Sequence, residues 1–192
     1  MLKSPVQGTE ASPFTFRYTV LPDDRERVRA IVESTGFFNP EEIEIAVELV
    51  DERLAKGAAS GYEFVFADAD GETVGYACFG RVPLTESSFD LYWIAVRAGQ
   101  RRGGLGRALI GAVEQLVTEA GGGRVYADTS GRDQYAPTRA FYAGTGYAQA
   151  AFFPDFFAPG DAKVVFVKPV ATPISMASPA SHGTPCNATD GG

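Results

Sequence analysis

Residues 96–110, with the sequence VRAGQRRGGLGRALI, join two predicted elements and concentrate glycine and arginine between them. A strand pattern over residues 89–96 ends where this segment begins, and apolar residues at helical spacing start at Leu105. The segment therefore predicts a loop that leads from a strand into the N-terminus of a helix. Helix N-termini carry unpaired N–H groups and a partial positive charge, so they bind phosphate groups readily.

The side chains of this loop favour an anionic ligand. Three glycines and three arginines lie close together: Gly103, Gly104, Gly106, Arg101, Arg102 and Arg107. Glycine lets a ligand approach the backbone, and guanidinium groups donate paired hydrogen bonds to phosphate oxygens. Two common nucleotide-binding loops do not fit. The segment lacks the Lys-Ser/Thr pair of the nucleotide-triphosphate loop G-x-x-x-x-G-K-[ST], and it has Leu109 in place of the third glycine of the dinucleotide fingerprint G-x-G-x-x-G. The loop therefore predicts a site for a diphosphate of another kind.

The composition indicates one ordinary globular domain. The chain has 192 residues, 45% of them hydrophobic, and a formal net charge of −7. This charge disfavours general binding to nucleic acid or to an anionic membrane surface. Only two cysteines occur, Cys78 and Cys186, and the sequence shows neither a secretion signal nor an apolar run long enough to cross a bilayer. We therefore expect a soluble cytoplasmic protein.

The single histidine, His182, lies in a polar C-terminal segment. Ser-His-Asp hydrolysis, a Cys-His pair and a His-ligated metal site all need an imidazole inside the folded domain. These chemistries are therefore disfavoured, no metal-ligand spacing appears, and we expect no metal. Acid–base chemistry is left to Asp, Glu and Tyr.

Strand and helix patterns alternate along the chain. They predict strands over residues 14–20, 62–67, 73–82, 89–96, 124–128, 147–153 and 163–168, and helices over about 22–35, 40–56, 105–120 and 135–144. We expect a flexible N-terminal segment (1–13), one domain (14–168) and a disordered tail rich in Ala, Ser, Pro and Gly (169–192). This order of elements predicts an α/β fold around a mixed sheet.

Two motifs in this order resemble the GNAT N-acetyltransferase family. Arg101, Gly104 and Gly106 form an R-x-x-G-x-G pattern that is similar to the acetyl-coenzyme A pyrophosphate loop of that family. Residues 141–147, FYAGTGY, match its late F-Y-x-x-x-G-[FY] signature. The resemblance covers residues 14–168 and implies a GNAT-type mixed, mostly antiparallel central sheet of about six to seven strands flanked by about four helices.

The resemblance also implies where acetyl-coenzyme A binds as co-substrate. It would lie between the strand ending at Val96 and the strand ending near Asp128. The residues implied in binding it are Ile94, Ala95, Val96, Arg101, Arg102, Gly103, Gly104, Leu105, Gly106, Arg107 and Thr129. Many family members have Asn just after the second of these strands, whereas this chain has Thr129-Ser130.

Acetylation of an amine needs a base and an acid. An alkylammonium with a pKa of about 10.4 carries a deprotonation penalty of roughly 4 kcal/mol near neutral pH. Strand alternation puts Asp90, Tyr92, Ile94 and Val96 on one face, and Asp90 stands where some GNAT members carry the base. An exposed or turn-forming Asp90 is the alternative, and Glu86, Glu63 or a water chain are weaker candidates. The resemblance implies that Tyr142, in the second motif, is the general acid, and a packing aromatic residue is the alternative.

The acceptor site is expected between aromatic loops. Phe37, Phe38, Glu86 and Tyr92 are the predicted substrate residues, with a core position as the alternative for Phe37 and Phe38. Loops at 130–135 and 152–161 could also shape the pocket, although the aromatic residues of the latter could seal a sheet edge or form a homodimer contact.

The sequence thus favours an N-acetyltransferase that transfers acetyl to a primary amine of a small molecule such as an amino acid or polyamine. A protein N-terminal or lysine acetyltransferase and a non-catalytic acyl-coenzyme A sensor are the alternatives.

Overall fold

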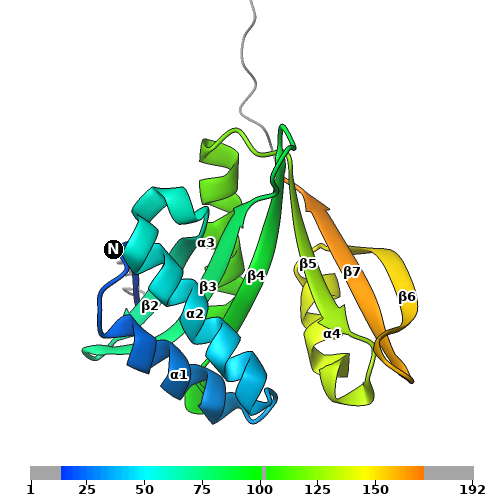
Figure 1. Cartoon of the computed structure of the whole chain (residues 1–192), viewed down its shortest axis with the longest axis horizontal. Coiled ribbons are helices and arrows are strands. Elements are labelled where there is room, and N and C mark those ends of the chain that lie inside the picture. Colours follow the sequence, from blue (N-terminus) through cyan, green and yellow to red (C-terminus); the bar gives the residue numbers. More distant parts are fainter. Residues whose placement is uncertain (1–13, 101–102, 171–192) are drawn as a thin grey trace, which may run out of the picture.

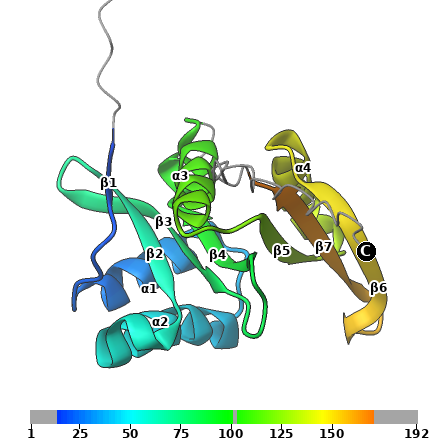
Figure 2. The ribbon, with the colours of Figure 1, turned by 90° about the horizontal axis from the view of Figure 1, so that it is seen from above.

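The computed structural model describes residues 14–100 and 103–170, which form a seven-stranded sheet with helices on both faces (Figures 1 and 2). The strands are β1 (Thr15–Arg17), β2 (Glu63–Ala69), β3 (Glu72–Arg81), β4 (Ser88–Val96), β5 (Arg124–Ser130), β6 (Ala148–Ala158) and β7 (Asp161–Pro169). The helices are α1 (Asp24–Thr35), α2 (Pro40–Lys56), α3 (Leu105–Glu119) and α4 (Ala136–Gly144), with 3-10 turns η1 (Gly57–Ser60), η2 (Ala98–Gln100) and η3 (Asp133–Tyr135).

The sheet order is β1-β2-β3-β4-β5-β7-β6. Neighbouring strands are antiparallel except β4 and β5, which are parallel and are connected through α3. The predicted α/β fold with a mostly antiparallel sheet of about seven strands and four helices is therefore confirmed. The expected N-terminal segment (1–13) and residues 171–192 of the expected tail (169–192) lie outside the described residues, whereas Pro169 is the last residue of β7.

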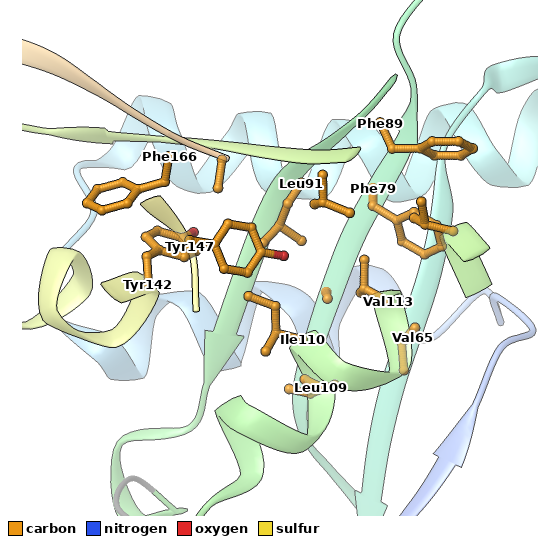
Figure 3. Packing of buried hydrophobic residues seen from close by; sticks show 14 of the residues in the cluster. Val65, Phe79, Phe89, Leu91, Leu109, Ile110, Val113, Tyr142, Tyr147 and Phe166 are labelled. Carbon is orange, nitrogen blue, oxygen red and sulfur yellow. The ribbon is translucent and has the colours of Figure 1, made fainter. Parts of the chain in front are cut away.

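Two buried clusters hold the helices to the sheet. In Figure 2, α1 and α2 cover one face of the sheet, and α3 and α4 lie on the other. The cluster under α3 includes Leu109, Ile110 and Val113, and it extends to Tyr142 on α4 (Figure 3). The helical spacing of these apolar residues positions α3 over the centre of the sheet.

Helix boundaries follow the predicted signals closely. Asn39 accepts a hydrogen bond from the Glu42 backbone N–H at 2.9 Å, and Glu42 accepts one from the Asn39 N–H at 2.7 Å. This capping box, with Pro40 at the first helical position, starts α2. Gly36 ends α1 with a left-handed backbone, φ 68°. The predicted start and end signals of these helices are confirmed.

Two predicted strand boundaries are wrong. The first strand covers only Thr15–Arg17, because the Arg17 side chain binds the start of α1 and the chain leaves the sheet there. The expected loop over residues 152–161 is instead the end of β6, the turn and the start of β7. Pro154 and Asp155, whose φ is 52°, disturb the register after Phe153 but do not end the strand.

A β-bulge in β4 changes the direction of its side chains. Cys78 pairs with Trp93, whereas the next residue of β3, Phe79, pairs with Leu91, so Tyr92 is an extra residue in β4. Such a bulge shifts the strict alternation of a strand by one position.

Side chains before and after the bulge therefore do not alternate as predicted. Leu91 and Ile94 both contact the cluster under α3, whereas Trp93 contacts the cluster under α1 and α2. Asp90 thus lies on the opposite face from Ile94 and Val96. The prediction of one shared face for Asp90, Tyr92, Ile94 and Val96 is wrong.

A buried ionic network ties β1 to α1. The Asp24 side chain is fully buried, and its carboxylate accepts hydrogen bonds from Arg17 and Arg27 and from the Leu21 N–H. The Arg17 Nε atom also donates to Asp68 at 3.0 Å. These contacts join the start of α1 to the edge of the sheet.

We expect Asp24→Ala to lower the free energy of unfolding by about 3 kcal/mol, because it leaves two guanidinium groups and a backbone N–H without their buried partner. Urea denaturation measures this effect. Asp23→Ala is the matched control, since the Asp23 side chain is 83% exposed and pairs only at 3.8 Å with Arg27. Equal effects of the two substitutions would show that the buried network does not stabilise the fold.

Candidate active site

The parallel strands β4 and β5 pair over only part of their length. Pairing runs from Ser88 and Arg124 to Leu91 and Ala127, and the strands then move apart (Figure 1). Beyond this point β5 continues to pair with β7, up to Ser130. The second half of β4 therefore has an edge without a strand partner among the described residues.

A cleft of about 1020 Å³ lies at this divergence. It is lined from β4 by Leu91–Val96 and from β5 by Asp128–Ser130. The remaining lining residues come from the α1–α2 connection, the α3 N-terminus, α4 and the two loops near β7: Thr35, Phe37, Phe38, Asn39, Glu42, Gln100, Gly104, Gly106, Arg107, Arg132, Tyr135, Pro137, Thr138, Phe141, Tyr142, Phe157, Ala158 and Asp161.

The N-terminus of α3 forms one end of the cleft. Gly104 is its N-cap, with a φ of 79° that favours glycine, and neither a side-chain cap nor an acidic first turn is present. A Cβ atom on Gly106 would lie 3.3 Å from the Phe141 ring, so glycine allows α3 and α4 to approach closely. The helix end can therefore receive an anion without competition from an acidic side chain.

The structure places the predicted loop residues differently. Gly104, Gly106 and Arg107 line the cleft, and Arg107 also donates to the Gly144 carbonyl at 2.9 Å. Gly103 and Leu105 do not line it, because Leu105 is buried in the core under α3. The predicted ligands Arg101 and Arg102 lie outside the described residues.

Tyr142 lies at the inner wall of the cleft. Its side chain is buried against Phe166 and Tyr147, with ring centres 5.4 and 5.6 Å away (Figure 3). Burial and the nearby Asp128 carboxylate raise the pKa of Tyr142 well above its usual value of 10. The phenol therefore stays protonated at neutral pH, as a proton donor must.

Two carboxylates, Asp90 and Asp128, interact electrostatically near the cleft. Asp128 lines the cleft and forms an ion pair with Lys163. Asp90 does not line the cleft, and burial, followed by the Asp128 charge, raises its pKa while Lys163 opposes the rise. Of these two carboxylates, only Asp128 lines the cleft.

Aromatic rings cover the other side of the cleft. Phe38 packs against Trp93 at 4.9 Å, and Phe37 packs against Tyr135 at 6.2 Å. Tyr92, also in the lining, contacts Tyr62 edge-on. Three of the four predicted substrate residues, Phe37, Phe38 and Tyr92, thus line the cleft.

The fourth predicted substrate residue, Glu86, lies outside the cleft lining. Glu86 belongs to the β3–β4 connection, and its backbone carbonyl accepts a hydrogen bond from Arg81 at the end of β3. That connection lies at the end of β4 where β4 and β5 remain paired.

Several lining residues were not among the predicted site residues. They are Asn39, Glu42, Asp128, Ser130, Arg132, Tyr135 and Asp161. The polar loop over 130–135 carried a signal for three of them. Asp161 is the last residue of the other expected pocket loop, 152–161, and the pairing of β7 with β5 and β6 determines its position.

The acetyltransferase (GNAT) family model matches residues 28–147 of this chain. The chain belongs to the GNAT acetyltransferase family. The protein is therefore an acyltransferase, and the expected family and enzyme class are confirmed. A comparison with curated proteins gave no match.

Solved structures of GNAT proteins share this fold. A GNAT-family protein from Desulfovibrio desulfuricans is 50% identical over 82% of this chain and 99% of its own, with a TM-score of 0.81. An aminoglycoside 6'-N-acetyltransferase complexed with coenzyme A is 16% identical, over 82% and 97%, with a TM-score of 0.65. The ribosomal-protein-S18-alanine N-acetyltransferase from Escherichia coli is 17% identical, over 84% and 98%, with a TM-score of 0.64.

Within residues 14–100 and 103–170, no helix is both long and apolar enough to cross a membrane. In the same part of the chain, no group of three or more His, Cys, Asp or Glu side chains is placed to hold a metal ion.

The charges around Asp90 predict opposite pKa changes in two variants. Asp128→Asn removes a like charge and should lower the pKa of Asp90, whereas Lys163→Met removes a cation and should raise it. NMR titration of the Asp90 carboxyl carbon measures both shifts. Lys56→Met, which removes an exposed lysine on α2, should leave this pKa unchanged. Shifts of the same sign in both cleft variants would contradict the assignment of these charges.

Proposed function

We propose that this enzyme transfers the acetyl group of acetyl-coenzyme A directly to a primary amine. The observation that carries the proposal is the cleft where β4 and β5 separate, with a helix N-terminus at one end and the buried phenol of Tyr142 in its wall. The coenzyme A complex of the aminoglycoside enzyme supports this ligand for the same fold.

The cleft fits acetyl-coenzyme A at two points. The edge of β4 from Tyr92 to Val96 offers backbone groups to the amide-rich pantetheine arm, in the manner of an added strand. The α3 N-terminus, with Gly104, Gly106 and Arg107, receives the diphosphate. Arg101 and Arg102 belong to the same motif, and we propose that they contribute further hydrogen bonds to it.

The reaction assigns one role to each side of the cleft. The amine nitrogen attacks the thioester carbonyl carbon, a C–N bond forms, and the C–S bond breaks. The proton lost by nitrogen passes to the carboxylate side, and Tyr142 gives its proton to the departing thiolate sulfur. Water then restores the Tyr142 proton.

We assign the base to the carboxylate pair formed by Asp90 and Asp128. Asp128 faces the cleft, where it can meet the ammonium form of the acceptor. The Asp128 charge contributes to the raised pKa of Asp90, and this raised pKa favours uptake of a proton by Asp90.

A small-molecule acceptor and a protein N-terminus or lysine are both compatible with an open cleft. The Escherichia coli neighbour acts on a ribosomal protein and the aminoglycoside enzyme on a small molecule, and both share only the fold at this identity. We favour a small molecule, because aromatic rings from two sides enclose the acceptor end. A non-catalytic sensor is disfavoured by Tyr142 in the cleft.

We also propose a cytoplasmic homodimer. The low cysteine content supports the cytoplasm. Phe152, Phe153, Phe156 and Phe157 are each about half exposed on the edge strand β6, where a second copy would cover them. No nucleic acid or membrane partner is proposed.

Tyr142→Phe should lower kcat by about 10²- to 10³-fold while leaving the KM for acetyl-coenzyme A nearly unchanged, because only the proton donor is lost. Thiol release from acetyl-coenzyme A with an accepted amine measures both constants. Tyr147→Phe is the matched control, since it removes another buried hydroxyl 5.6 Å away by ring centre that does not line the cleft. A Tyr142→Phe enzyme with full kcat would refute the acid role.

Gly104→Ala should raise the Kd for coenzyme A by about tenfold or more, because a methyl group and backbone strain are added at the proposed diphosphate site. Isothermal titration calorimetry measures this change. Gly121→Ala controls for strain, as Gly121 also has a positive φ and lies at the other end of α3. If both variants bind coenzyme A equally well, the ligand does not occupy the α3 N-terminus.

A further inference from the structure

Arg132 is a cation in the cleft wall that the acetyl transfer described above does not use. Its side chain is 51% exposed, and its Nε atom forms an ion pair with the Asp161 carboxylate at 3.0 Å. The Nη atoms make no hydrogen bond with any residue of the described chain. Half of the guanidinium group is therefore anchored and the other half is open to a ligand.

Asp161 holds this guanidinium in a fixed orientation. The Asp161 side chain is 8% exposed and also accepts a hydrogen bond from the Ser130 hydroxyl. The Arg132 guanidinium lies 5.8 Å from the centre of the Tyr135 ring, which Phe37 contacts from the α1–α2 connection. A side chain held at Nε and against an aromatic ring loses less conformational freedom when it binds an anion.

The backbone around Arg132 is equally constrained. Its N–H donates to the Ser130 hydroxyl at 3.1 Å, and its carbonyl accepts from Arg139 at 2.8 Å. The Gly131 N–H donates to the Ala162 carbonyl at 2.6 Å, and a Cβ atom on Gly131 would lie 3.0 Å from the Ala162 side chain. The loop that carries Arg132 is thus fastened to β7 and α4.

Two opposite charges of the cleft wall lie close together in the sequence, one on β5 and one in the loop that follows it. Asp128 lies on β5 and Arg132 follows the end of that strand by two residues. Positions 128 and 130 of an extended strand are about 7 Å apart, and the Arg132 side chain lies beyond them. An acceptor that carries both an ammonium group and an anion has a partner of opposite charge for each group in the cleft lining, whereas a second ammonium group would be repelled by Arg132.

We propose that Arg132 determines acceptor specificity by binding a carboxylate, so that the acceptor is an amino acid or another small amine with a carboxylate group. This inference rests on the proposed acetyl transfer to an amine and selects one class among its acceptors. The paired N–H groups of a guanidinium match the two oxygens of a carboxylate.

Matched acceptors test this role directly. Glycine, β-alanine, 4-aminobutyrate, 6-aminohexanoate and a set of L-amino acids are assayed by thiol release, each beside its carboxamide and with a simple diamine for comparison. For the best acceptor, the wild-type enzyme should prefer the acid over the amide by about 10- to 100-fold in kcat/KM. The reason is that a hydrogen bond between two charged groups is stronger than one to a neutral amide.

Arg132→Gln should remove this preference by raising KM for the acid, with little change for the amide or in kcat. Arg132→Lys should retain part of it. Arg25→Gln is the matched control, because Arg25 is 49% exposed and also pairs with an aspartate, Asp51, on the outer helices. The Kd for coenzyme A and the thermal midpoint report whether each variant is folded.

The outcomes separate this inference from the proposed function. Three outcomes would overturn the role of Arg132 and leave acetyl transfer intact. The enzyme could acetylate acids and amides equally well, it could prefer the diamine, or Arg132→Gln could slow the reaction of acid and amide alike. Failure of every amine to release thiol would refute the proposed function and the Arg132 inference together.

Discussion

The loss of pairing between β4 and β5 after Leu91 and Ala127 is the constraint on which the site depends. Parallel strands normally pair along their length, because unpaired backbone groups are costly when buried. Here β5 remains satisfied on its other edge by β7 as far as Ser130, and β4 by β3 as far as Val96. The sheet therefore opens on one side without losing either strand.

The closed end of this opening is held by the cluster under α3. That cluster includes Leu91 on β4 and Ala127 on β5, and it extends to Tyr142 and Phe166. Tyr142 is thus fixed by packing at the point where the strands separate. The bulge at Tyr92 occurs immediately after Leu91, the last residue of β4 that pairs with β5, and it turns Trp93 toward α1 and α2. One end of the cleft is consequently lined by aromatic rings.

The fold and one end of the site could be predicted from the sequence because they depend on local signals. Hydrophobic periodicity located the elements, Asn39 and Gly36 marked helix boundaries, and the glycine-rich loop marked the α3 N-terminus. Each of these signals lies within a few neighbouring residues, so it can be interpreted without knowledge of the tertiary structure.

Features that depend on pairing between distant strands could not be predicted. The bulge at Tyr92 arises from the register of β4 against β3. No local signal in the sequence indicates that Asp90 and Ile94 lie on opposite faces of the sheet. The grouping of Asp128 with Lys163, and of Arg132 with Asp161, depends on the antiparallel pairing of β5 and β7. The predicted strand over 147–153 also proved too short, because β6 continues to Ala158, which pairs with Asp161.

Hydrogen–deuterium exchange with and without acetyl-coenzyme A tests most directly whether the gap between β4 and β5 is the coenzyme site. Backbone N–H groups along the edge of β4 from Tyr92 to Val96 have no β5 partner, so a bound ligand should slow their exchange. We predict protection there and in the first turn of α3, with none in the β2–β3 hairpin. Protection confined to other elements, or equal protection across the whole sheet, would contradict the account.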